Sequence, residues 1–212
     1  MLHKRLLKLV ISNLASEVLN DTDTDFKALL ALVACTRVSP EFNYISRQFL
    51  KKFHLKSARS SCILLEILTQ NPYICTYVHA LKVVLRNPSN GQLYDPMDAI
   101  ISRILDMLGD RRSGERNFRC LEIYAVDLDL HTGPVHWTAR SPEFLSSVDK
   151  LIKSKSLTWV GISELSAPMD LIIKCASNVE NLTIRRVKLC ESDSGSGTSQ
   201  SLEGPNICLT IR

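Results

Sequence analysis

The sequence has few chain-breaking residues and few aromatic ones. Only 8 of its 212 residues are glycine, 8 are proline and 6% are aromatic, whereas 45% are hydrophobic and 23% are charged. A chain this apolar and this poor in breakers is not predominantly disordered. A chain of this length can also bury a core without a structural metal or a disulfide. We therefore expect a folded globular protein, although composition does not decide its fold class.

Long apolar runs are missing as well. No stretch of 18 or more consecutive apolar residues occurs, so we expect no membrane span. The opening MLHKRLLKLVISNLASE places a basic patch before an apolar run, as a signal peptide does. Lys8 interrupts that run, and its apolar residues recur at helical spacing. These features favour an amphipathic helix over a signal peptide.

The cysteines form no recognisable framework. They number seven, which is odd, and they include no C-x-x-C pair and no Cys/His cluster at zinc spacing. Several lie inside apolar runs, where free cysteine is commonly buried. We expect free thiols, a reducing compartment (cytoplasm or nucleus), no metal and no cofactor.

The first 57 residues indicate three short helices. The first carries apolar residues on one face, and a second begins after an acidic loop at Asp25, which is placed to cap it. Ser39 and Pro40 then supply an N-cap and a first-turn proline for the third. The basic excess lies here, since residues 1–59 hold ten basic and five acidic residues while the whole chain has a net charge of +4.

From residue 50 onward, one spacing of apolar residues recurs: apolar, two others, apolar, one other, apolar. Helical segments lie between the copies, over residues 62–68, 97–108, 143–152 and 169–175. Ser141 and Pro142 repeat the cap and first-turn proline before the third of these segments. This alternation predicts parallel strands joined by crossover helices, because a tight turn cannot join adjacent parallel strands. The copies are Leu50, Phe53 and Leu55; Val78, Leu81 and Val83; Phe118, Leu121 and Ile123; Leu157, Val160 and Ile162; and Val179, Leu182 and Ile184.

Polar residues interleave the apolar ones within these strands, as Lys82, Glu122 and Thr183 do. One sheet face should then meet solvent, whereas a doubly wound sheet needs continuously apolar strands. We predict an α/β or α+β fold: a helical segment over residues 1–52, then a short, irregular leucine-rich-repeat-like solenoid over residues 53–212. The Ser/Gly-rich residues 191–204 are expected to be a flexible insertion. The last residues resemble the start of a strand, which suggests a truncated solenoid.

Taken together, the chain resembles the F-box proteins with leucine-rich-repeat-like tails that are abundant in mushroom-forming fungi. RLLKLVISNL is similar to the first F-box helix, LLALVACTRVSPEF to the second helix and the stretch after it, and KKFHLKS to the first strand beyond the box. Val38 matches the family's valine and Phe42 its tryptophan. The chain departs from the family by lacking the opening Leu-Pro-x-Glu turn and by carrying Ser39 and Pro40 where the family has cysteine and a basic residue.

The resemblance implies a substrate-recruitment subunit of a Skp-cullin-F-box ubiquitin ligase, with a Skp-type adaptor and an unknown protein substrate as partners. The alternative is a recognition scaffold whose degenerate box only caps the repeats. Trp159 is either a packing residue or a binding hot spot. The residues implied to contact the adaptor are Leu6, Leu7, Ile11, Leu14, Val38 and Phe42. The residues expected to bind the substrate are Lys82, Glu122, Thr158, Trp159, Thr183 and Arg185.

Enzyme motifs are scarce. No G-x-S-x-G, P-loop or dinucleotide fingerprint occurs. One cluster, Asp127, Asp129, His131 and His136, could serve a metal-assisted hydrolase, but its two histidines are five apart across a Gly-Pro turn. We expect a polar loop there and no enzyme. We also expect no nucleic-acid binding, because Phe49 and Phe53, which interleave the N-terminal basic residues, lie at core spacing.

Overall fold

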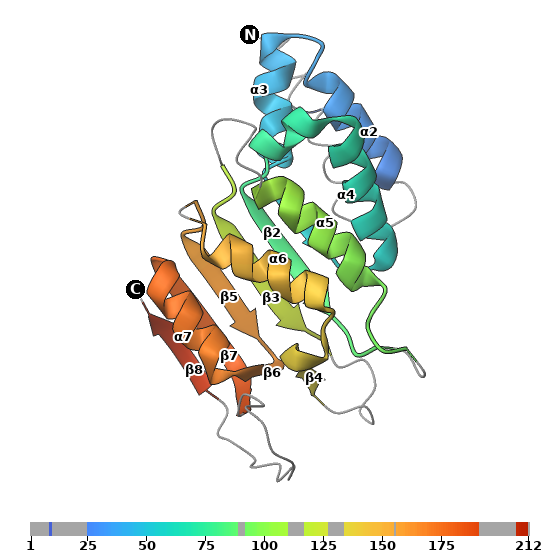
Figure 1. The fold of residues 1–212 in the computed structure, drawn as a ribbon. Helices are drawn as coiled ribbons and strands as arrows, with labels where there is room; N and C mark the ends of the chain where they lie inside the picture. The colour runs from blue at the N-terminus through green and yellow to red at the C-terminus, as the bar shows by residue number, and fades with distance from the viewer. Residues whose placement is uncertain are drawn as a thin grey trace.

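The computed structural model describes residues 9, 25–88, 92–109, 117–126, 134–154, 156–190 and 207–211. These residues form an α/β fold in which helices and strands alternate (Figure 1). The elements are α2 (Asp25–Cys35), α3 (Pro40–Phe49), β1 (Lys52–Leu55), α4 (Ala58–Gln70), the 3-10 helix η1 (Pro72–Thr76), β2 (Ala80–Leu85), α5 (Met97–Gly109), β3 (Cys120–Ala125), β4 (Val135–His136), the 3-10 helix η3 (Trp137–Ala139), α6 (Pro142–Ile152), β5 (Trp159–Ser163), β6 (Leu165–Pro168), α7 (Met169–Asn178), β7 (Asn181–Cys190) and β8 (Ile207–Ile211).

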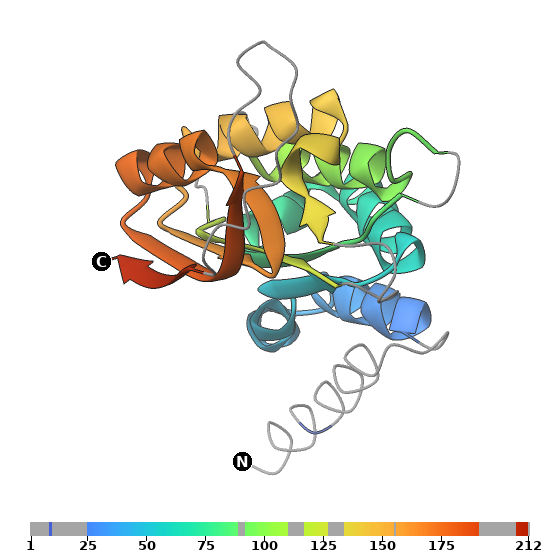
Figure 2. The same ribbon diagram turned by 90° about the horizontal axis from the view of Figure 1, so that it is seen from below.

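Seven strands are parallel to one another and run in the order β1-β2-β3-β5-β7-β6-β4, and β8 pairs antiparallel with β7. Helices α4, α5, α6 and α7 lie side by side over one face of this sheet (Figure 1). Seen along the sheet, the strands curl beneath an arc of those helices (Figure 2). The parallel strands and crossover helices predicted from the spacing are confirmed.

The core lies between the sheet and this helix layer. Leu81, Leu121, Val160 and Leu182 are paired across four strands, and each is at most 1% exposed. They are the middle members of the repeated spacing, which therefore marks the side of each strand that faces the helices. The predicted serine caps are also present: Ser39 Oγ accepts from the Phe42 N–H, and Ser141 Oγ accepts from the Phe144 N–H.

The predicted architecture, an N-terminal helical bundle followed by a leucine-rich-repeat-like solenoid, is wrong. Leu32, Val33 and Leu50 belong to the same hydrophobic core as the strand residues, so α2 and α3 pack as part of the α/β fold. The strand units do not simply repeat either. The ten-residue β7 pairs with β5 along its first half, with β6 near its end, and with the antiparallel β8. The predicted insertion at residues 191–204 lies outside the described residues.

Two residues with positive φ bend the last strands. Glu164, at φ 60°, separates β5 from β6, and Arg186, at φ 51°, lies within β7. Their side chains form an ion pair at 3.0 Å, and the Glu164 N–H donates to the Arg185 carbonyl oxygen at 3.0 Å. The left-handed conformation is costly for such residues, so it persists only where the surrounding structure holds it. The two neighbouring strands therefore change direction together, and β6 becomes available to pair with β4.

A buried ion pair joins the helix layer to the sheet. Arg140, just before α6, donates from Nε to Asp98 Oδ2 at 3.1 Å and also from Nη2 to Asp98 Oδ1. Both side chains are 1% exposed. Asp98 also accepts from the Ser141 N–H at 2.8 Å, and Arg140 donates to the Arg86 carbonyl oxygen beyond β2 at 2.5 Å. Burial raises the pKa of Asp98. The hydrogen bonds from Arg140 and Ser141 lower this pKa, but their effect is smaller than that of burial.

Replacing Arg140 by methionine should destabilise the protein by about 3–5 kcal/mol, because it leaves the Asp98 carboxylate buried without its cation. The double variant Asp98→Leu/Arg140→Met should lose less, since the fully buried carboxylate is removed together with its cation. Asp95, 3.6 Å from Arg140 and 12% exposed, also loses its cation but keeps the hydrogen bond from the Met97 N–H. Urea unfolding followed by circular dichroism measures both. Arg103, exposed on α5, provides the control: Arg103→Met should change the unfolding free energy by less than about 0.5 kcal/mol. Equal stability of the Arg140→Met and Arg103→Met variants would contradict this role.

Candidate functional site

The sheet face opposite helices α4–α7 is here called the open face, and α2 and α3 lie toward this side (Figure 2). It carries the residues that alternate with the core residues along each strand. Strand register arranges these residues in rows. The first row is Lys52, Ala80, Cys120, Trp159 and Asn181; the second is His54, Lys82, Glu122, Gly161 and Thr183; and the third includes Val84, Tyr124, Ser163 and Arg185. Most of these side chains are exposed or half-buried. The face is therefore a mixed polar and aromatic surface.

An ion pair occupies the middle of the open face. Lys82 Nζ lies 2.9 Å from Glu122 Oε1, and each side chain is 34% exposed. The same ammonium lies 4.7 Å from the centre of the Tyr124 ring, within the range of a cation–π contact. A half-exposed pair of this kind contributes at most about 1 kcal/mol to stability. Its main effect is to hold three side chains in one arrangement.

Trp159 lies against the backbone of Gly161. A Cβ atom placed on Gly161 would come within 2.5 Å of Cη2 of the Trp159 indole, and within 3.1 Å of two further ring atoms. The indole thus occupies the space that any side chain at position 161 would need. Trp159 nevertheless stays half-buried. It is a packed residue that still presents part of its ring on the open face.

The residues that precede β2, β3 and β5 form the rim at the start of the strands. The Lys51 carbonyl oxygen accepts from the N–H groups of His79 and Ala80 at 2.8 and 2.9 Å. The His79 carbonyl accepts in the same way from Arg119 and Cys120, and the Arg119 carbonyl from Thr158 and Trp159. These pairs of hydrogen bonds fix the order Lys51, His79, Arg119, Thr158 along the rim.

The structure brings together five of the six residues predicted to bind a substrate. Lys82, Glu122 and Thr183 share one row of the open face, with Trp159 and Arg185 in the rows on either side. Thr158 instead lies on the rim, where its hydroxyl donates to the Arg119 carbonyl oxygen at 3.4 Å. Sequence reasoning missed Tyr124 and Gly161. Strict alternation along β3 and β5 would have placed both on this face.

The structure describes two of the six residues implied to contact an adaptor. Val38, between α2 and α3, is 66% exposed, whereas Phe42 on α3 is half-buried and packs against the core. Leu6, Leu7, Ile11 and Leu14 lie outside the described residues.

The hydrolase cluster gains no support from the residues that can be placed. His136 is exposed on β4, and Asp127, Asp129 and His131 lie outside the described residues. Within the part of the chain that the structure describes, no group of three His, Cys, Asp or Glu side chains could hold a metal ion.

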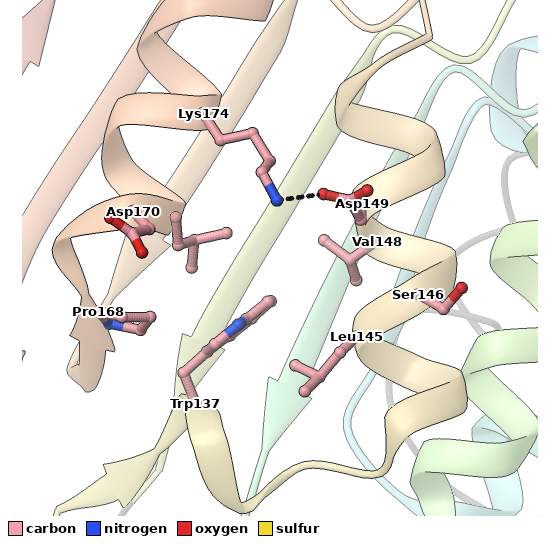
Figure 3. Close-up of a pocket in the computed structure, with 9 residues that line it drawn as sticks. Trp137, Leu145, Ser146, Val148, Asp149, Pro168, Asp170 and Lys174 are labelled. Atoms are coloured by element: carbon pink, nitrogen blue, oxygen red, sulfur yellow. Dashed lines mark hydrogen bonds and ion pairs between the residues drawn. The ribbon is translucent and has the colours of Figure 1, made fainter. Parts of the chain in front are cut away.

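A cleft of about 330 Å³ opens on the other side of the sheet, between α6 and α7 (Figure 3). The Trp137 indole points into it from below, and Lys174 Nζ reaches across it to Asp149 Oδ1 at 2.5 Å. Hydrogen bonds from Lys153 and Lys174 lower the pKa of Asp149. The cleft is lined by Trp137, Leu145, Ser146, Val148, Asp149, Pro168, Asp170, Leu171 and Lys174. Its walls could hold an apolar group, but they carry no nucleophile paired with a base.

No protein-family model matches the chain, and no curated protein or solved structure matches it either. Across the described residues, no helix combines the length and apolar character needed to cross a bilayer. The open face is therefore the feature of this chain that bears on its function.

Replacing Gly161 by alanine should lift the Trp159 indole off the sheet, because the new methyl group needs the same space. Tryptophan emission should shift to longer wavelength, and acrylamide quenching should increase. Trp137 is only 7% exposed, so it should contribute a constant background. Ser163→Ala, on the same strand and face, is the matched control. Identical quenching of the Gly161→Ala and Ser163→Ala variants would show that the indole does not rest on Gly161.

Proposed function

We propose that this protein is a non-catalytic interaction protein that binds a partner protein on its open face. The observation that carries the proposal is the half-buried Trp159, which lies in the first row of that face and is held against Gly161 in the second row. Tryptophan is enriched at binding hot spots, and a side chain already ordered by its own sheet loses little further entropy on binding. The Lys82–Glu122 pair beside it supplies fixed polar groups that can orient a partner.

The proposed location is the cytoplasm or the nucleus. Cys35, Cys62, Cys75, Cys120, Cys175 and Cys190 are all free thiols. Burial raises the pKa of Cys175 to about 12, so this thiol is inert in the folded protein. Free thiols in both buried and exposed positions suit a reducing compartment.

Replacing Trp159 by serine should abolish partner binding while leaving the fold intact. The intact chain would be immobilised and exposed to a lysate of the cells that express it, with captured proteins quantified by mass spectrometry. Capture of the partner should fall by about tenfold or more, as expected for loss of a hot-spot tryptophan. Ile173→Ser is the control, because Ile173 is an apolar side chain 56% exposed on α7, which covers the other face of the sheet. A capture profile unchanged by Trp159→Ser would reject the proposal.

Exposed apolar side chains around α2 and α3 favour a second candidate, substrate recruitment to a Skp-cullin-F-box ubiquitin ligase. Val38 is 66% exposed and Tyr44 on α3 is 69% exposed. Val38 is also the residue that matches the valine of the F-box resemblance. Large apolar groups in solvent often mark an interaction surface. In this candidate the α2–α3 region binds the Skp-type adaptor while the open face binds the substrate.

Adaptor binding can be measured by calorimetry with a purified Skp-type adaptor. The intact chain should bind, and Val38→Asp should weaken binding about tenfold by burying a charge in the interface. Ile173→Asp makes the same chemical change at a distant exposed site and should have no effect. If the unaltered chain does not bind the adaptor, the ligase role is wrong, whereas recognition through the open face is unaffected.

A further inference from the structure

Three basic residues lie at the start of strands β1 and β3, on the rim and first row that border one corner of the open face. Lys52 begins β1, and Lys51 and Arg119 precede β1 and β3 on the rim. Lys52 and Arg119 are exposed, and Lys51 is half-buried. The rim hydrogen bonds hold these positions together although Arg119 is far from the lysines in sequence, since His79 bonds to both Lys51 and Arg119. The corner is therefore a feature of the fold and not of one basic stretch.

The charges of these basic residues shift the pKa values of two neighbouring side chains, His79 and Cys120. Burial lowers the pKa of His79, and the charges of Lys51 and Arg119 lower it further. Lys52 and Arg119 likewise oppose the effect of burial on the Cys120 thiol, whose pKa is raised. Two residues in this corner thus experience a positive potential, which favours bound anions and disfavours further positive charge.

The positive charge of the corner is not neutralised by the described residues. Lys51 Nζ donates to the neutral Gln48 amide oxygen at 2.7 Å. None of the ion pairs found among the described residues includes Lys51, Lys52 or Arg119. Lys82, by contrast, is matched by Glu122 at 2.9 Å. The open face is therefore electrostatically balanced at its centre and positive at this corner.

The basic corner is within reach of Trp159. Lys52 and Trp159 share one row, separated by the short side chains of Ala80 and Cys120. Three strand spacings of about 4.8 Å place their backbones about 14 Å apart. An extended chain covers that distance in about four residues. A segment lying across the strands could therefore contact the indole with one side chain and the basic corner with carboxylates about four positions away.

We propose that the partner segment recognised by the open face is acidic, with an apolar or aromatic side chain for Trp159 and carboxylates for Lys51, Lys52 and Arg119. This inference rests on the proposed function, since it names the chemistry of the partner on the same face. Nucleic acid is disfavoured because three cations give a small electrostatic footprint, and because the Lys82–Glu122 pair leaves the centre of the face without net positive charge for further phosphates. Complementary charge at the edge of an apolar contact typically selects the partner and speeds association.

The test is selection of peptides from a phage-displayed random 12-residue library on the immobilised full chain. Peptides that bind should carry net negative charge and an apolar or aromatic residue about four positions from the acidic cluster. A synthetic fluorescent peptide of the most enriched sequence then gives dissociation constants. Binding should weaken several-fold between 50 and 300 mM NaCl, because exposed charges are screened by salt.

Matched charge reversals locate the contact. Arg119→Glu and Lys52→Glu should each weaken binding of the selected peptide by about fivefold or more. Arg103→Glu, on the exposed side of α5, makes the same change in net charge as Arg119→Glu and should have no effect. If Arg119→Glu and Arg103→Glu weaken binding equally, the loss of binding reflects the net charge of the protein and not a contact at the corner, and the inference is wrong.

The possible outcomes distinguish failure of the acidic-partner inference from failure of the proposed binding function of the open face. Selected peptides that are neutral or basic but lose binding on Trp159→Ser would overturn the acidic partner and keep the open face as a binding site. Peptides insensitive to Trp159→Ser, or no enriched peptides, would count against both. A single-stranded oligouridylate that displaces the acidic peptide and binds more tightly than it does would make nucleic acid the preferred ligand and overturn the inference.

Discussion

The sheet buries only one of its faces, and this constraint determines where the helices lie. The buried face is marked by a single row of paired residues that all face the helices: Leu81, Leu121, Val160 and Leu182. Burying apolar surface is the main favourable term in folding, and here only one side of each strand offers enough of it. The crossover helices are therefore confined to that side (Figure 1). The opposite side is left to polar and aromatic residues, so the candidate site follows directly from how the core is built.

Local signals in the sequence were sufficient to predict the helices and strands, but they were insufficient to predict how these elements are arranged. The recurring spacing located β2, β3, β5 and the start of β7, and Ser39 and Ser141 marked the beginnings of two helices. The break between β5 and β6 and the bend within β7 lie instead at the positive-φ residues Glu164 and Arg186. Neither residue is of the glycine or asparagine type that normally signals positive φ, so nothing in the sequence announces these bends. Interpreting the copies as a stacked solenoid overlooked them.

The candidate site was predictable to a similar degree. Alternation within strands identified Lys82, Glu122, Trp159 and Thr183, because side-chain direction follows from parity alone. The basic corner was not predictable in the same way. Lys51 and Arg119 become neighbours only through the register of β1, β2 and β3 and the rim hydrogen bonds at His79. Contacts of this kind depend on long-range pairing, which a spacing pattern within one strand does not encode.

The first strand has a further consequence. β1 has only four residues and lies at the end of the strand order, so that among the described strands it pairs with β2 alone. An unpaired edge offers N–H and C=O groups to a second copy of the chain and so favours aggregation. Shortness and charge are the usual protections, and Lys52 and His54 are both exposed on β1. Lys52 therefore adds charge that disfavours pairing at this edge, beside the recognition role proposed for it.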